Sequence, residues 1–172
     1  FLPVEDQGIA QLQYTLPAGA TQPRTVAAAK TIQEYFRHEL KGVDSVYTVT
    51  GQSNAGSGQN TGRGFVKFKP WDERTSKDLK AESLTKKATQ DLGKRLRDVQ
   101  FYALNPPAVR GLGQSNGFQM EFLNTSGLSR ADFKAKRDEL LALAQDDPVL
   151  SSVRLGSLED NPTLKIDMRS EE

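Results

Sequence analysis

The segment VDSVYTVTGQSNAGSGQNTGRGFVKFK, which covers residues 43–69, sets two strand-like stretches on either side of a glycine-rich one. Its first residues are rich in β-branched and aromatic side chains, which favour extended structure. Its last residues alternate, with Val66 and Phe68 on the face opposite Phe65. The stretch 51–64 holds five glycines and no apolar side chain larger than Ala. This pattern predicts a hairpin whose strands are joined by a long loop.

The glycine spacing does not fit a phosphate-binding loop. Gly56, Gly58 and Gly62 follow the pattern G-x-G-x-x-x-G, and the next predicted element is a strand. Phosphate loops need a helix N-terminus, whose N–H groups and dipole favour an anion. Two interpretations remain: a flexible hairpin loop, or a loop with a function, because about a dozen residues is longer than a hairpin turn needs.

The residues before this hairpin predict a strand and a helix. Residues 9–16 alternate, with Tyr14 and Leu16 on one face, as in a half-buried strand. A helix is predicted to begin after Thr21, which can cap it. A stripe of apolar residues at spacings of three and four continues this helix to Leu40.

The residues after the hairpin predict a second helix and a fourth strand. The helix is expected over 76–98, where Leu84, Ala88 and Leu92 recur every four residues, and the strand over 99–104. The order is then β-α-β-β-α-β. This is the ferredoxin-like split βαβ order, an α+β fold in which both helices cover one face of an antiparallel four-stranded sheet.

The same pattern starts again after a linker of small and polar residues, but it is not completed. Strands are predicted for 118–123, 149–155 and 163–168, and Ser129 begins a helix with an S-x-x-D capping pattern. The second βαβ unit is therefore partial. Either its missing half comes from elsewhere, or the edge of its sheet is exposed.

Composition argues against several classes of function. The chain is 36% hydrophobic and 26% charged with a net charge of +1, which gives no electrostatic drive toward nucleic acid. It has no cysteine, a single histidine at position 38, and no carboxylate pair that suggests acid–base catalysis or metal binding. We therefore predict no catalytic residue, no metal site and no cofactor. No apolar run approaches the roughly 20 residues that span a bilayer, and the absence of an initiator Met suggests a piece of a longer protein.

Aromatic side chains fall on both faces of the predicted strands. Neighbours such as Phe101 and Tyr102 point to opposite sides of a strand. Since the helices of this fold cover one face, aromatic residues on the other face need a second subdomain, a subunit or an apolar ligand as a partner. The aromatic residues concerned are Tyr47, Phe65, Phe101, Tyr102, Phe118 and Phe122.

Several motifs occur in an order that resembles one family. They are FLPVEDQG at the start, LPAGAT before the first helix, AGSGQNTG, FVKFKPWDERT, NPPAV and, near the end, SVRLGSLEDNPTLKID. Together they resemble the porter region of resistance–nodulation–division (RND) multidrug efflux pumps, in the hydrophobe/amphiphile efflux inner-membrane subunit of the AcrB/MexB type. The resemblance covers essentially the whole chain.

The resemblance implies a division of the chain. Residues 1–111 would form the first C-terminal porter subdomain, with the ferredoxin-like fold. Residues 113–160 would form the first half of the second porter subdomain, and 161–172 would begin the insertion of the docking subdomain. The missing half of the second unit would return after that insertion. The chain would then be a periplasmic portion of a Gram-negative inner-membrane protein.

The resemblance also implies three groups of site residues, none of them catalytic. The switch loop, which separates two drug pockets, corresponds to Gly51, Gln52, Ser53, Asn54, Ala55, Gly56, Ser57 and Gly58. The deep drug pocket corresponds to Tyr47, Val49, Gln52, Asn54 and Phe65. The proximal pocket and entrance cleft correspond to Tyr102, Leu104, Pro106, Gly111, Phe118 and Arg154.

Four of these positions depart from well-known members of the family. Gln52 and Asn54 stand where those members carry phenylalanine, Ser57 where they carry arginine, and Gly111 where they carry an acidic residue. A more polar loop loses apolar and stacking contact with flat aromatic drugs. We therefore predict a preference for smaller, more polar or charged substrates.

The implied partners are those of a tripartite pump. They are small amphiphilic drugs or other xenobiotics, the N-terminal porter and docking subdomains of the same pump, two further copies in a homotrimer, a periplasmic adaptor and an outer-membrane channel. Two alternatives stay open: a non-catalytic assembly module, and the porter domain of another RND branch. Metal export is disfavoured by the absence of Cys and by only one His and two Met.

Overall fold

The computed structural model describes residues 5–106, 119–150 and 153–158. The described residues form two compact units, one within 5–106 and the other within 119–158. Each unit has its own secondary structure, and the first contains all the strands of the described chain.

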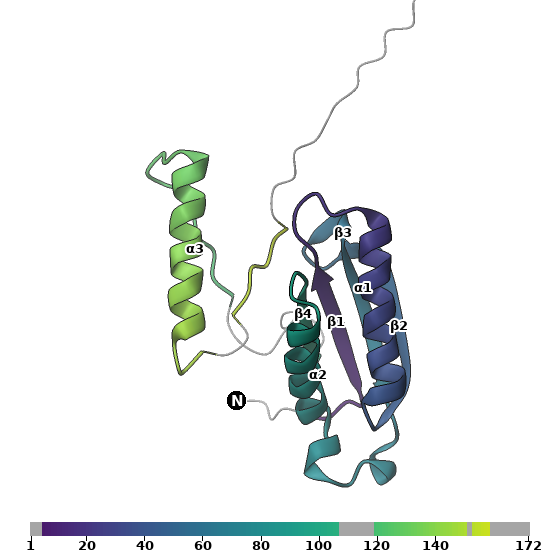
Figure 1. Ribbon diagram of the computed structural model, residues 1–172. Coiled ribbons are helices and arrows are strands. Elements are labelled where there is room, and N and C mark those ends of the chain that lie inside the picture. The colour runs from purple at the N-terminus through teal and green to yellow at the C-terminus, as the bar shows by residue number, and fades with distance from the viewer. Residues whose placement is uncertain (1–4, 107–118, 151–152, 159–172) are drawn as a thin grey trace, which may run out of the picture. The chain divides into compact units, whose positions relative to one another are not determined.

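The first unit is an antiparallel sheet with two helices on one face (Figure 1). Its strand order is β2-β3-β1-β4. The predicted ferredoxin-like α+β fold is therefore confirmed. The elements are β1 Ile9–Thr15, α1 Gln22–Glu34, β2 Val43–Ser53, β3 Gly56–Phe68, α2 Ala81–Arg95 and β4 Gln100–Leu104, with a π-helical turn η1 at Tyr35–Glu39.

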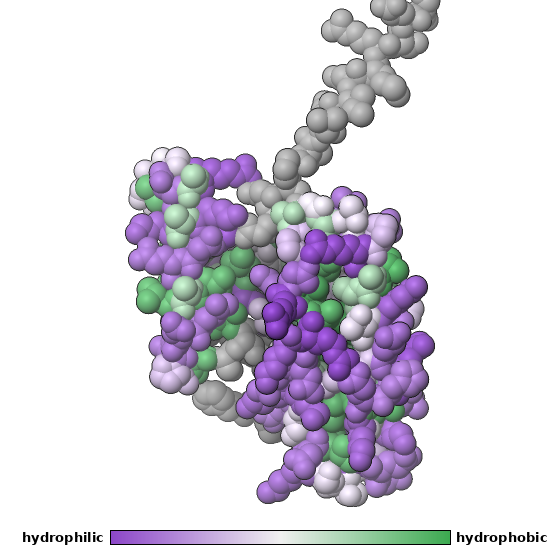
Figure 2. Space-filling view, in the orientation of Figure 1, coloured by the Kyte–Doolittle hydropathy of each residue, from purple (hydrophilic) through white to green (hydrophobic). Residues whose placement is uncertain are grey.

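The core lies between the sheet and the two helices. Ala10, Leu12 and Tyr14 alternate along β1 and are buried, as the sequence predicted for this face. The apolar stripes of α1 and α2 pack against them, with Ile32 and Leu92 fully enclosed. Hydrophilic side chains predominate on the outer side of these helices (Figure 2).

The second helix begins five residues later than predicted. A 3-10 turn, η3 (Lys77–Leu79), precedes it, and Lys80 is extended with φ −66° and ψ 147°. The Leu79 carbonyl accepts a hydrogen bond from the buried guanidinium of Arg74 at 2.9 Å. Because this carbonyl is held by a side chain, the helix starts only at Ala81.

The glycine-rich stretch is mostly strand, so the prediction of a long loop is wrong. β2 runs to Ser53 and β3 begins at Gly56, which leaves Asn54 and Ala55 as a two-residue turn. Backbone hydrogen bonds hold such a ribbon without apolar side chains, and hydrophobic patterning therefore gives no sign of it.

Two of the glycines are required by close packing. A Cβ on Gly62 would lie 2.2 Å from Cζ of Tyr14, and one on Gly64 would lie 2.5 Å from the Tyr47 carbonyl oxygen. Both distances are far below van der Waals contact. The ring of Tyr14 fills the space that a side chain at position 62 would occupy.

The second unit contains the helix α3, Arg130–Asp146, and no strand among its described residues. The predicted cap is confirmed, because the Asp132 N–H donates to Ser129 Oγ at 3.2 Å. The predicted strands 118–123 and 149–155 are wrong where they are described, since 119–123, 149–150 and 153–155 are irregular. The predicted strand 163–168 lies outside the described residues. A strand needs a partner for its backbone groups, and the described part of this unit offers none.

A pair of glycine substitutions tests the packing of Tyr14. We expect Gly62→Ala to lower the free energy of unfolding by about 1–3 kcal/mol, because the new methyl group overpacks the core. Gly93→Ala is the matched control, since Gly93 lies on the exposed side of α2 and a methyl group there would have no heavy atom within 4 Å. It should raise the unfolding free energy by up to about 1 kcal/mol. Urea denaturation measures both, and equal effects would contradict this account.

Candidate functional site

The sheet face away from α1 and α2, called the open face below, carries five of the eleven predicted pocket residues. Side chains at alternate positions of each strand project from it, while their neighbours enter the core. Tyr47 is 64% exposed and Phe65 is 46% exposed. Large aromatic side chains with this exposure are suited to contact a partner or a ligand.

Strand register places these residues in two rows. In the first row Tyr47 pairs with Phe65, Phe65 with Gln11, and Gln11 with Leu104. Directly opposed residues in antiparallel strands have their Cβ atoms about 5 Å apart and share a face. Two aromatic rings therefore lie at one end of this row and an aliphatic side chain at the other.

The second row is more polar. Val49 pairs with Arg63, Arg63 with Gln13, and Gln13 with Tyr102. Sequence reasoning did not single out Arg63 and Gln13. The alternation of β3 contains the signal for Arg63, because this residue lies two positions before Phe65 on the same face.

The structure thus brings together residues that were predicted for two different pockets. Tyr47, Val49 and Phe65 lie on β2 and β3, Tyr102 and Leu104 lie on β4, and β1 runs between the two groups. Pro106 follows β4 and is half-buried. Arg154 belongs to the second unit and is half-buried there. Gly111 and Phe118 lie outside the described residues.

The predicted switch loop forms the outer end of the β2–β3 hairpin. Gly51 has φ +91° at a break in register between Thr50 and Gln52, and Gly56 has φ +139° at the turn. These backbone conformations are open to glycine and strained for other residues. The side chains of Gln52 and Asn54 are exposed.

The hairpin is tied to the rest of the unit just below this end. The Leu16 N–H donates to the Asn60 carbonyl at 2.8 Å, and Thr25 Oγ1 donates to the Gln59 carbonyl at 2.7 Å. Residues 51–58 extend past these two points as a two-stranded ribbon. The register break at Gly51 and the anchors at Gln59 and Asn60 therefore bracket the base of the ribbon.

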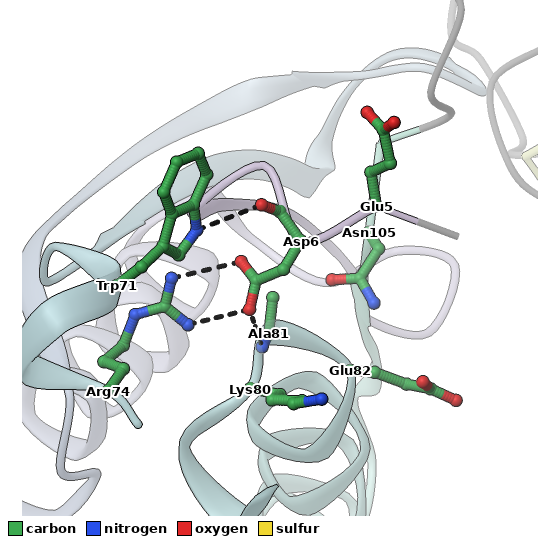
Figure 3. Close-up of a pocket in the computed structure, with 8 residues that line it drawn as sticks. All are labelled: Glu5, Asp6, Trp71, Arg74, Lys80, Ala81, Glu82 and Asn105. Atoms are coloured by element: carbon green, nitrogen blue, oxygen red, sulfur yellow. Dashed lines mark hydrogen bonds and ion pairs between the residues drawn. The ribbon is translucent and has the colours of Figure 1, made fainter. Parts of the chain in front are cut away.

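A hollow of about 330 Å³ lies at the opposite end of the unit beside Asp6 and Arg74 (Figure 3). Arg74 donates from Nη1 to Asp6 Oδ2 at 3.0 Å and from Nη2 to Asp6 Oδ1 at 3.1 Å. Its Nε also donates to the Lys69 carbonyl at 2.6 Å. The Arg74 side chain is 1% exposed. Its donors are used within the protein.

Asp6, like Arg74, makes several hydrogen bonds within the protein. Its carboxylate accepts from the backbone N–H groups of Ala81 at 2.8 Å and Gly8 at 2.9 Å, and Trp71 Nε1 donates to its carbonyl oxygen at 3.1 Å. Burial opposes the charged carboxylate, but the hydrogen bonds from Arg74, Ala81 and Gly8 outweigh it and lower the pKa of Asp6 to about 2. This cluster, the Asp6–Arg74 clasp, joins the segment before β1 to the start of α2.

The clasp should make the first unit sensitive to acid. The pKa of Asp6 falls from 3.8 to about 2 on folding, so the ionised carboxylate stabilises the fold fully above about pH 4. This stability is lost as the pH falls through about 2. We expect Asp6→Asn to lower the free energy of unfolding at pH 7 by about 2 kcal/mol and to flatten its dependence on pH between 4 and 2.

A surface ion pair supplies the control for the clasp. Glu73 pairs with Lys69 at 3.4 Å, with both side chains about half exposed. We expect Glu73→Gln to change the unfolding free energy at pH 7 by less than about 0.5 kcal/mol. A loss as large as that of Asp6→Asn would show that the clasp has no special role. Urea denaturation across the pH series measures both variants.

The described residues contain no group of three or more His, Asp or Glu side chains placed to hold a metal ion. His38, the one histidine, is exposed on η1. Within the same residues, no helix has the length and hydropathy needed to cross a bilayer.

Comparison with known proteins assigns the family. The sequence pattern that defines the AcrB/AcrD/AcrF family matches residues 1–172. The chain therefore belongs to this family of RND multidrug efflux proteins, as the motifs suggested.

Individual relatives match along nearly the whole chain. It is 39% identical to the multidrug export protein AcrF of Escherichia coli, over 99% of this chain and 17% of that protein. It is 37% identical to the toluene efflux pump membrane transporter TtgB of Pseudomonas putida and 36% identical to the multidrug resistance protein MdtF of Escherichia coli. These two matches cover 99% of this chain and 16% of each relative. The chain thus spans about a sixth of the length of these relatives.

Proposed function

We propose that the chain is a periplasmic porter portion of a proton-driven RND efflux transporter and that its open face contacts the transported drug. The observation that carries this proposal is the grouping of Tyr47, Phe65, Val49, Tyr102 and Leu104 on one helix-free sheet face. Names of relatives such as multidrug export protein and toluene efflux pump support an apolar or amphiphilic cargo. The chain acts as a binding surface and conduit, without catalysis.

The rows of the open face suit weak, adaptable contact. Tyr47 and Phe65 offer aromatic surface on which a flat ring can stack, and Gln11 and Gln13 offer amide groups within the same rows. Arg63 is the one charged residue of the two rows. A surface of this kind can contact a ligand over a large area in more than one orientation. A transporter of varied compounds requires such contact.

The end of the hairpin is proposed as a gate between a deep pocket beside Tyr47, Val49 and Phe65 and a proximal pocket near Tyr102 and Leu104. Gly51 supplies the backbone freedom at its base, since the register of the ribbon already breaks there. Gln52 and Asn54 at its end are polar and exposed. The gate would therefore favour small polar or charged substrates over flat aromatic ones.

The gate predicts a gain of aromatic substrates. In the full-length transporter, we expect Gln52→Phe with Asn54→Phe to raise resistance to flat aromatic drugs several-fold, because two phenyl rings add stacking surface. Resistance to small polar drugs should stay level or fall. The measurement is a panel of minimum inhibitory concentrations at matched expression. An unchanged resistance profile would refute the role of these two positions.

An assembly role is the second candidate, and the second unit favours it. Four of its apolar side chains are more than half exposed, namely Met120 at 61%, Leu123 at 69%, Leu143 at 66% and Val149 at 87%. Exposed apolar groups of this size are typical of surfaces that meet another part of an assembly. We propose that other subdomains of the pump, its homotrimer, the periplasmic adaptor and the outer-membrane channel are partners of the whole protein.

Two double variants separate the candidates in the full-length transporter. For drug contact, we expect Tyr47→Ala with Phe65→Ala to weaken binding of a flat aromatic substrate about tenfold and to leave the oligomeric state unchanged. For assembly, Leu123→Ser with Leu143→Ser should shift the oligomeric state by light scattering. Unchanged drug binding in the first double variant would overturn the proposed role of the open face.

A further inference from the structure

Arg63 stands near the middle of the open face and makes no ion pair with any residue that the structure describes. It lies in the second row, between Val49 and Gln13. Its Nε is buried and has no hydrogen-bond partner. Lys67, four residues further along β3, differs because it pairs with Asp44 at 3.1 Å. Within the described residues, Arg63 therefore presents an uncompensated positive charge.

The buried Nε–H of Arg63 has no hydrogen-bond acceptor among the described residues, and a bound ligand could supply one. A guanidinium carries five N–H donors in a planar fork that matches the two oxygens of a carboxylate or sulfonate. Leaving such a donor desolvated and unpaired is costly, so a ligand that supplies the acceptor recovers this energy. The two rows contain no Asp or Glu that could do so from within the sheet.

The neighbours of Arg63 define the rest of the ligand. Val49 lies directly opposite, Phe65 is two residues along the same strand, and Tyr47 pairs with Phe65 in the adjacent row. Gln13 on the other side offers an amide. An acidic group on the guanidinium would place an attached ring beside Phe65 and Tyr47, within about two residues of strand.

We propose that Arg63 is the residue of the open face that determines specificity and that it selects small aromatic anions, which are carboxylates or sulfonates attached to a ring system. The acidic group binds the guanidinium and the ring lies against Phe65 and Tyr47. This inference rests on the proposed role of the open face in drug contact. It narrows the ligands of the open face to amphiphiles that carry a negative charge.

Two fluorescent probes with the same ring skeleton test the proposal. They are 8-anilinonaphthalene-1-sulfonate, which is anionic, and N-phenyl-1-naphthylamine, which lacks the sulfonate. Their affinities are measured by fluorescence titration of the purified full-length transporter and of three variants. Arg63→Gln removes the charge, Arg63→Lys keeps it without the fork, and Arg37→Gln removes a charge from an exposed arginine on η1.

The expected result is a selective loss. Arg63→Gln should weaken binding of the anionic probe at least about tenfold, the effect of one charge-assisted hydrogen bond. Its binding of the neutral probe should stay within about twofold. Arg63→Lys should lose less affinity for the anion, and Arg37→Gln should behave as the wild type does.

The outcomes distinguish this inference from the function on which it rests. Anionic binding that is unchanged in Arg63→Gln, with the neutral probe still bound, overturns the role of Arg63 alone. Failure of the wild type to bind either probe, or neutral binding that does not change in Tyr47→Ala with Phe65→Ala, overturns the open face as a ligand surface. Equal losses in Arg37→Gln and Arg63→Gln would reduce the effect to net charge and overturn the assignment to Arg63.

A competition measurement on the wild type needs no variant. Benzoate should displace the anionic probe at concentrations at least about tenfold lower than phenyltrimethylammonium, which has a similar ring and the opposite charge. Displacement at equal concentrations, or by the cation first, would overturn the inference even if the Arg63 variants do not fold.

Discussion

The contact of Tyr14 with β3 is the constraint on which the first unit depends. Its ring occupies the space above Gly62, and its hydroxyl donates to the Val49 carbonyl of β2 at 3.1 Å. Burial raises the pKa of Tyr14 to about 12, so the hydroxyl remains a donor at any physiological pH. One side chain therefore links β1, β3 and β2. Because a shift of one residue in register would turn every side chain to the other face, this link also determines which residues form the open face.

The two ends of the first unit differ in how their polar side chains are used. At one end the Asp6–Arg74 clasp uses its donors and acceptors within the protein, and it holds the segment before β1 against the start of α2. At the other end the hairpin extends past its anchors at Gln59 and Asn60 with exposed polar side chains. The open face lies between these ends. In the proposed function, the hydrogen-bonded clasp and the extended ribbon border the face that contacts the drug.

The family relationship and the geometry bear on different questions. Family membership rests on a match along residues 1–172, and the relatives are named for multidrug export and toluene efflux. Geometry adds what the names do not contain, namely two rows of side chains in which Arg63 stands beside aromatic residues, with its buried Nε unpaired among the described residues. The proposal of a charged cargo rests on the positive charge of Arg63 and on the polar end of the hairpin. These two features come from independent residues on β3 and in the turn.

The sequence by itself determined the order and type of the elements in the first unit. Periodicity is local, and it predicted the helix that begins after Thr21 and the alternation of β1, although the Thr21 side chain makes no capping hydrogen bond. The capping pattern at Ser129 predicted the start of α3. Local patterns also predicted the α+β class. Tertiary structure decided the length of the hairpin, because backbone pairing there continues through residues with no apolar pattern. It also decided which residues of four strands share the open face, and the pairing of Asp6 with Arg74, which are 68 residues apart. The predicted strands of the second unit did not form in its described residues, because a strand pairs only when a neighbour is present.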